Sequence, residues 1–119
     1  MAGKLPFSPS YGAGPFVFVS GKIGADPDTG ALPPGDLRKQ TRLALENIRR
    51  VLEDGGLSLE DVVKTTVFLT DMRHYPDMNE EYVAMFPEKL PARTCVAVSS
   101  LPRVEALVEI EAIAYTGKS

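Results

Sequence analysis

The chain has 119 residues, the size of one domain, and its 44% hydrophobic and 24% charged residues are an ordinary globular composition. The net charge of −3, with no basic run, argues against binding to nucleic acid or to an anionic membrane surface, because such binding needs clustered lysine and arginine. The chain has a single cysteine, Cys95, and a single histidine, His74, which exclude an intrachain disulfide and a Cys/His zinc cluster. Because it has no long apolar run, we expect a soluble, cytoplasmic protein without a membrane partner.

The first half of the sequence predicts a strand, a loop and a long helix. Residues 16–24, FVFVSGKIG, form a short run of β-branched and aromatic side chains, which is typical of a strand. The next residues, ADPDTGALPPGD, are those of turns and loops, and Asp36 at their end is suited to cap a helix. Apolar residues then recur at helical spacing until Gly55 and Gly56, which provide a left-handed stop. The predicted apolar stripe comprises Leu37, Ala44, Leu45, Ile48, Val51 and Leu52.

The second half predicts a strand, a helix and two more strands. Residues 62–70, VVKTTVFLT, read as a strand after a short capped turn at SLED. Met and aromatic residues recur at helical spacing over residues 75–86, a stripe that is more typical of core than of a ligand site. Residues 93–100 and 107–115 are the remaining predicted strands, and LPRVEA lies between them.

The two predicted helices are too few to cover both faces of the predicted sheet, which predicts a partner. Two long helices can cover only one face of a sheet of four to six strands, so the other face must be polar or buried by another molecule. In the last strand, Glu109 and Glu111 alternate with apolar residues that suit packing under helices. We expect Arg93 and Cys95 to share the glutamates' face on an adjacent strand, and we infer a homo-oligomer that buries this mixed face.

The charged residues on that face admit two interpretations. A buried carboxylate must be paired or must lie in a wet pocket, because burying it alone is costly. In the first interpretation, Arg93 pairs with a glutamate and fixes the register between subunits. In the second, Arg93 binds a substrate carboxylate in a pocket at a subunit boundary while a glutamate handles protons. The alternation of residues leaves both interpretations open.

Several motifs resemble one family in the same order along the chain. They are FVFVSGKIGADPDTG, QTRLALENIRRVLEDGGLSLEDVVKTTVFLTDM, MNEEYVAMF, and finally PARTCVAVSSLP with VEIEAIA. Together they resemble the RidA/YjgF family, also labelled endoribonuclease L-PSP, over nearly all of one domain, residues 1–119. The resemblance implies an α+β, chorismate-mutase-like fold with a mixed β-sheet and two helices on one face. It also implies a homotrimer with a central barrel and active sites between subunits.

The resemblance implies hydrolytic deamination of reactive 2-imino and enamino acids to 2-keto acids and ammonia, as in a 2-iminobutanoate/2-iminopropanoate deaminase. Arg93 matches the arginine that grips the substrate carboxylate, for which a planar guanidinium is well suited. Glu109, the first Glu of EIEAIA, matches the glutamate that orients or activates water, and Glu111 is expected to be structural. Cys95 matches a position whose backbone contacts the substrate or the water. No metal and no organic cofactor are expected.

Five further positions match residues around the family's pocket. Ser20 and Gly21, in VSGKIG, match positions that line it. Asn79 and Phe86 match positions near its rim. Phe7 stands where RidA-like members carry a tyrosine, so this chain lacks a hydroxyl there.

Two other departures and two alternative functions accompany the resemblance. Leu90 stands where PAR is often preceded by Phe, and the segment from Pro102 to Glu109 is one residue longer than usual. Phe7 and the longer segment motivate an alternative in which the protein binds small carboxylates, or regulates a partner, without deaminase turnover. An endoribonuclease or translation inhibitor is disfavoured by the net negative charge and by the lack of a basic stripe with interleaved aromatic residues.

Overall fold

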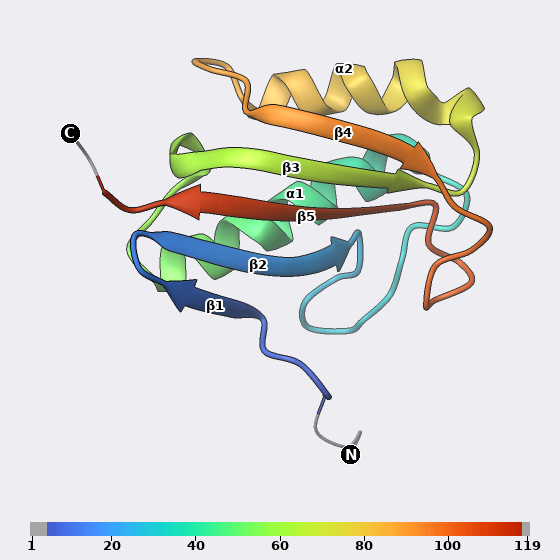
Figure 1. The fold of residues 1–119 in the computed structure, drawn as a ribbon. Coiled ribbons are helices and arrows are strands. Elements are labelled where there is room, and N and C mark those ends of the chain that lie inside the picture. Colours follow the sequence, from blue (N-terminus) through green and yellow to red (C-terminus); the bar gives the residue numbers. More distant parts are fainter. Residues whose placement is uncertain (1–4, 118–119) are drawn as a thin grey trace.

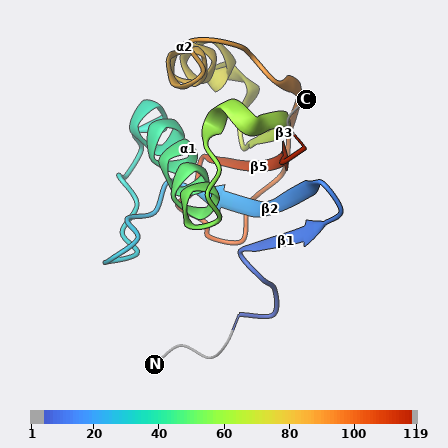
Figure 2. The same ribbon diagram turned by 90° about the vertical axis from the view of Figure 1, so that its left-hand side faces the viewer.

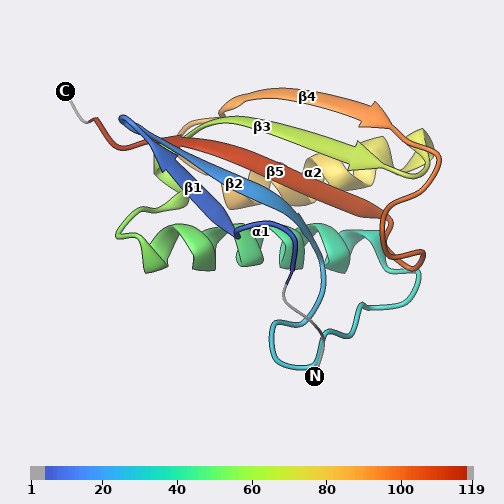
Figure 3. The same ribbon diagram turned by 60° about the horizontal axis from the view of Figure 1, so that its bottom comes forward.

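The computed structural model describes residues 5–117, which fold into one five-stranded sheet with two helices packed on the same face (Figures 1 and 2). The sheet has the strand order β1-β2-β5-β3-β4, so β1 and β4 form its edges and β5 lies between β2 and β3 (Figure 3). Only β3 and β4 pair in parallel. The strands are β1 (Ser10–Ala13), β2 (Phe16–Ile23), β3 (Val62–Leu69), β4 (Ala92–Ala97) and β5 (Val108–Tyr115). The helices are α1 (Leu37–Asp54) and α2 (Tyr75–Met85), with short 3₁₀ turns at Leu59–Asp61 and Met72–His74.

Helix α1 begins and ends where the sequence predicts. The side chain of Asp36 accepts a hydrogen bond from the Lys39 backbone N–H at 3.0 Å and caps the first turn. Gly56 follows the helix at a φ of +79°, which is the left-handed conformation that glycine adopts most easily. Leu37, Ala44, Leu45, Ile48 and Leu52 are buried, and Val51 is half-buried.

Strand β3 fixes which residues share a face of the sheet. Thr65 pairs with Arg93 of β4 on one side and with Ala112 of β5 on the other. Because neighbours in register point to the same face, these three side chains lie on the face covered by the helices. Phe68, which points to the opposite face, pairs with Glu109 and Val96.

The structure confirms the face predicted for β5 and corrects the one predicted for β4. Val108, Ile110, Ala112 and Ala114 are all buried under the helices. The prediction that Arg93 and Cys95 share a face with Glu109 on adjacent strands is wrong, since β3 lies between β4 and β5 and Arg93 points toward α2. The alternation within residues 93–98 defines two side-chain sets, and apolarity alone predicts that the set containing Val96 packs under the helices. At this edge strand, however, Val96 is exposed on the open face.

The segment before β5 is anchored by a buried glutamine. Gln40 of α1 donates through Nε2 to the backbone oxygens of Pro33 and Glu105, at 2.9 and 3.3 Å, and its Oε1 accepts from the Leu107 N–H at 2.8 Å. The turn before β5 projects outward at Val104, which is 87% exposed, while the start of β5 keeps its register with β3. Among residues 5–117 no helix is long and apolar enough to cross a membrane.

Candidate functional site

Arg93 lies in an aromatic setting at the edge of the sheet. Its Cζ atom is 4.9 Å from the ring centroid of Tyr82 and 5.5 Å from that of Tyr75, both on α2. Nη2 donates to the Tyr75 hydroxyl at 3.1 Å, and Nη1 lies 3.7 Å from the Met78 sulfur. No carboxylate within residues 5–117 forms an ion pair with Arg93. The guanidinium is thus held by rings and weak acceptors and keeps donors for an anion.

Cys95 presents its backbone, rather than a reactive thiol, to the same edge. Burial raises the pKa of its thiol above the ordinary value, and the charge of Arg93 only partly opposes this, so the thiolate is disfavoured at neutral pH. The Val98 N–H bonds to the Leu69 oxygen of β3, at 2.8 Å. Because N–H groups alternate in direction along a strand, the N–H of Cys95 points away from β3, toward the unpaired edge.

Asn79 and Phe86 lie on and just after α2, on the side of the sheet that holds Arg93. Phe86 is 5% exposed, and its ring centroid is 4.9 Å from that of Tyr82, so within one chain it belongs to the core. The Asn79 Oδ1 atom is buried and accepts no hydrogen bond from any described residue. A buried acceptor of this kind is normally satisfied by water or a ligand.

Glu109 lies on the open face, directly over Gly21. A Cβ atom placed on Gly21 would lie 2.1 Å from the Glu109 Oε2 atom, so only glycine leaves space for this carboxylate. The pairing of β2 with β5 shifts between Val19 and Lys22. This shift sets both Ser20 and Gly21 opposite Glu111 in a β-bulge. The pKa of the Glu109 carboxyl is raised, first by burial and then by the nearby charge of Glu111.

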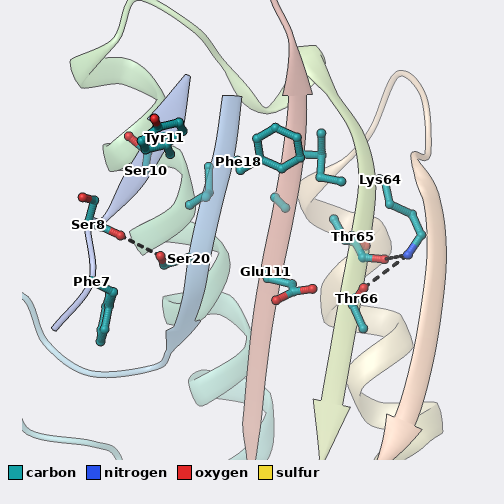
Figure 4. Close-up of a pocket in the computed structure, with 13 residues that line it drawn as sticks. Phe7, Ser8, Ser10, Tyr11, Phe18, Ser20, Lys64, Thr65, Thr66 and Glu111 are labelled. Atoms are coloured by element: carbon teal, nitrogen blue, oxygen red, sulfur yellow. Dashed lines mark hydrogen bonds between the residues drawn. The ribbon is translucent and has the colours of Figure 1, made fainter. Parts of the chain in front are cut away.

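A cavity of about 600 Å³ opens on the same face (Figure 4). Phe7, Ser8 and Ser20 line one side, where Ser20 Oγ donates to the Ser8 backbone oxygen at 2.7 Å. Glu111 projects from β5 toward Thr66 of β3, so the glutamate expected to be structural lines this cavity. The remaining lining residues are Ser10, Tyr11, Phe18, Val19, Lys64, Thr65, Ala112 and Ile113.

The predicted site residues therefore fall into two groups on opposite faces of one sheet. We call Arg93, Cys95, Asn79 and Phe86 the arginine group, and Glu109, Gly21, Ser20 and Phe7 the glutamate group. Within one chain, the arginine group and the glutamate group do not come together.

Sequence reasoning missed the residues that surround Arg93. The helical spacing of Tyr75, Met78 and Tyr82 predicts a core stripe, which is correct for Met78 and Tyr82. Tyr75 is 39% exposed, so it lies at the surface end of this stripe. The position of Tyr75 at the very start of the predicted helix was the one sequence signal that it could lie at the surface. Within residues 5–117 no group of three or more His, Cys, Asp or Glu side chains could hold a metal ion.

Comparisons with known proteins agree with the fold and its motifs. The family model described as Endoribonuclease L-PSP matches residues 1–116. A RutC family protein of Pyrococcus horikoshii is 51% identical over 110 residues, which are 92% of this chain and 86% of that protein. A mouse protein named 2-iminobutanoate/2-iminopropanoate deaminase is 40% identical over 94% of this chain and 82% of its own length. The crystal structure of Escherichia coli TdcF with bound serine superposes with a TM-score of 0.90, at 39% identity, covering 97% of this chain and 91% of TdcF. The chain therefore belongs to the RidA/YjgF family, whose members are also called RutC or endoribonuclease L-PSP proteins.

Proposed function

We propose that the protein hydrolyses reactive 2-imino and enamino acids to 2-keto acids and ammonia, at sites formed between two copies of the chain. The observation that carries the proposal is Arg93, a half-buried guanidinium without an acidic partner among the described residues. It is supported by the relatives named as deaminases of such compounds, one of them at 40% identity. The serine bound to TdcF indicates that a family member accepts a small amino acid.

Arg93 would bind the substrate carboxylate. A guanidinium has five N–H donors in a plane, and the contacts to Tyr75 and Met78 use two of them. The remaining donors are enough for a bidentate carboxylate, which is the strongest pairing that this side chain makes. The Cys95 backbone N–H at the same strand edge is available to a second polar atom of the ligand. Binding of an α-carboxylate would thus hold the neighbouring imine carbon at a fixed distance from the edge of β4.

Glu109 would move protons in the hydrolysis. Its carboxylate accepts a proton from water as the water oxygen bonds to the imine carbon, and the carboxyl group returns this proton to nitrogen, so that the C=N bond becomes the C–N single bond of a neutral carbinolamine. The carboxylate then accepts the carbinolamine hydroxyl proton as the C=O bond forms and the C–N bond breaks, and this second proton goes to the departing nitrogen, which leaves as ammonia. A raised pKa suits this role, because a group that both accepts and donates a proton works best near the ambient pH.

The two groups would meet only across an interface. Arg93 and Glu109 point to opposite faces, and β3 separates their strands by roughly 10 Å. One chain therefore cannot place both beside one small molecule. Apolar side chains on the open face, including Phe18 and Val96, are exposed in the single chain and need cover. A homotrimer, the assembly that the family resemblance implies, would supply it.

The test couples this protein to a threonine dehydratase in the presence of semicarbazide, which traps the released imine. The protein should suppress the trapped product, and Arg93→Ala should abolish the suppression. Arg50→Ala, an exposed arginine on α1, is the matched control and should behave as wild type. A fully active Arg93→Ala protein would refute the role of Arg93, and wild-type protein without effect would refute the deaminase activity on this substrate.

One feature favours a second candidate function, a small-carboxylate receptor without turnover. The aromatic setting of Arg93 is complete within one chain, whereas the glutamate group has Phe7 where RidA-like members have a tyrosine. A receptor would bind a 2-keto acid measurably, yet it would not accelerate imine hydrolysis. Calorimetric titration with 2-oxobutanoate beside the trapping assay separates the two functions, because only the deaminase gives both binding and turnover.

A further inference from the structure

Arg93 is oriented by protein groups that carry no charge. An arginine that binds substrate is often aimed by a carboxylate, which also neutralises part of its charge. Here the neighbours are two tyrosine rings, one hydroxyl and one thioether. Rings attract a cation through their electron-rich faces, yet they take none of the planar N–H donors. The positive charge therefore stays available to an incoming anion.

The inner ring has a fixed position. Tyr82 is 2% exposed, and its hydroxyl shares a hydrogen bond of 2.6 Å with the hydroxyl of Thr65. Thr65 is itself buried and lies in register with Arg93 across the β3–β4 pair. The Tyr82 ring also contacts the ring of Phe86, with the two centroids 4.9 Å apart. Tyr82 thus forms a rigid platform that sets the depth of the guanidinium.

The outer ring controls direction. Tyr75 begins α2, directly after the 3₁₀ turn Met72–His74, and its side chain is partly exposed. Its hydroxyl is the only oxygen among the described residues that accepts a hydrogen bond from the Arg93 side chain. Since a guanidinium on a flexible stem can rotate about its last bonds, one hydrogen bond at Nη2 is enough to select its plane.

We propose that Tyr75 and Tyr82 form an aromatic clamp that orients Arg93 for a substrate carboxylate, with the Tyr75 hydroxyl as the positioning group. The buried Tyr82 ring sets where the guanidinium lies, and Tyr75 sets which donors face outward. The inference deepens the proposed function and rests on it to the extent that the ligand carries a carboxylate. It predicts that the Tyr75 hydroxyl contributes to ligand affinity without taking part in proton transfer.

The decisive variant is Tyr75→Phe, which removes one oxygen and keeps the ring. Calorimetry with 2-oxobutanoate should show an affinity loss of about three- to tenfold, which is the range for one net hydrogen bond. In the coupled assay KM should rise by a similar factor while kcat stays within about twofold, because the hydroxyl does not touch the imine carbon. The melting temperature should not change, since Tyr75 is at the surface. Tyr115→Phe, another partly exposed tyrosine, is the control and should leave affinity and KM unchanged.

The inner ring is tested by a pair of substitutions at Tyr82. Tyr82→Phe keeps the ring and should keep the affinity, although loss of the bond to Thr65 lowers stability. Tyr82→Leu removes the ring and should bind about three- to tenfold more weakly than Tyr82→Phe, as expected for loss of a cation–π contact. A folded Tyr82→Leu protein with wild-type affinity would overturn the role of the inner ring.

The clamp and the proposed function fail in different ways. Wild-type affinity and KM in Tyr75→Phe would overturn the clamp while leaving the deaminase in place. Wild-type protein that binds 2-oxobutanoate but does not hydrolyse imines would refute the deaminase, and a weaker Tyr75→Phe would still support the clamp. Wild-type protein that neither binds nor hydrolyses would overturn both.

Discussion

Replacing Gly21 with alanine tests whether the position of the Glu109 carboxylate matters. Gly21 lies in the bulge of β2, and its backbone conformation is one that alanine also adopts, because its φ is not positive. The substitution therefore adds one methyl group without backbone strain. That methyl group would lie 2.1 Å from Oε2, 2.9 Å from Cδ and 3.1 Å from Cγ of Glu109.

The size of the effect follows from these distances. Non-bonded carbon atoms prefer separations of about 3.5–4.0 Å, so the Glu109 carboxylate must move by about 1 Å or more. A misplacement of about 1 Å at a reacting centre can reduce a rate by about 100-fold. The moving atoms are the end of a flexible side chain, so we expect Gly21→Ala to lower the free energy of unfolding by no more than about 1 kcal/mol.

The assay compares three glycine-to-alanine variants in imine hydrolysis and in urea unfolding. Gly21→Ala should lose kcat by about 10- to 100-fold and remain folded. Gly12→Ala in β1 meets nothing closer than 4.0 Å and should behave as wild type, whereas Gly24→Ala would place its Cβ 2.4 Å from the Gln40 backbone oxygen and should lose stability instead. A folded Gly21→Ala protein with wild-type kcat would show that the position of Glu109 over Gly21 is not required for catalysis.

Two further predictions concern the charge of Glu109 and the anchor before β5. Glu109→Gln should reduce kcat by about 10²- to 10⁴-fold. The variant should also be more stable than the wild type at pH values above the ordinary carboxylate pKa. The reason is that the raised pKa of Glu109 in the folded state makes ionisation cost stability as the pH rises through it. Unfolding measured between pH 4 and 8 checks this, and lower stability of the variant at neutral pH would contradict it. Gln40→Ala should cost about 2–4 kcal/mol in urea unfolding by leaving the Leu107 N–H and two carbonyl groups unpaired, against under about 0.5 kcal/mol for the exposed Lys39→Ala. Equal stability of these two variants would refute the anchoring role of Gln40.

Local sequence signals were sufficient to predict the helices and the main strands, and to predict which side chains of β5 face the helices. Asp36 and Gly56 mark the ends of α1 because capping and left-handed stops depend on nearby atoms only. The face of β5 followed from alternation because one of its two side-chain sets is uniformly apolar. The short pairing of β1 with β2 was expected only in outline, since its four residues carry no strong pattern.

The arrangement of the site depended on contacts that are remote in sequence. The faces of β4 could not be assigned by apolarity, because this edge strand leaves Val96 exposed and holds Arg93 half-buried beside α2. Motif resemblance paired Arg93 with Glu109, yet it carried no information on which face each occupies. The contact between Gly21 and Glu109 arises from a bulge, whose extra residue no sequence period reveals.

Mixing two inactive variants tests most directly whether the site is built from two copies. Arg93→Ala and Glu109→Gln proteins should each be inactive alone. After unfolding and refolding together at equal amounts, a ring of subunits joins an intact Arg93 to an intact Glu109 at one interface in four on average, so about a quarter of wild-type activity should return. Refolded mixtures with no activity, although the variants assemble together, would contradict a site shared between two chains.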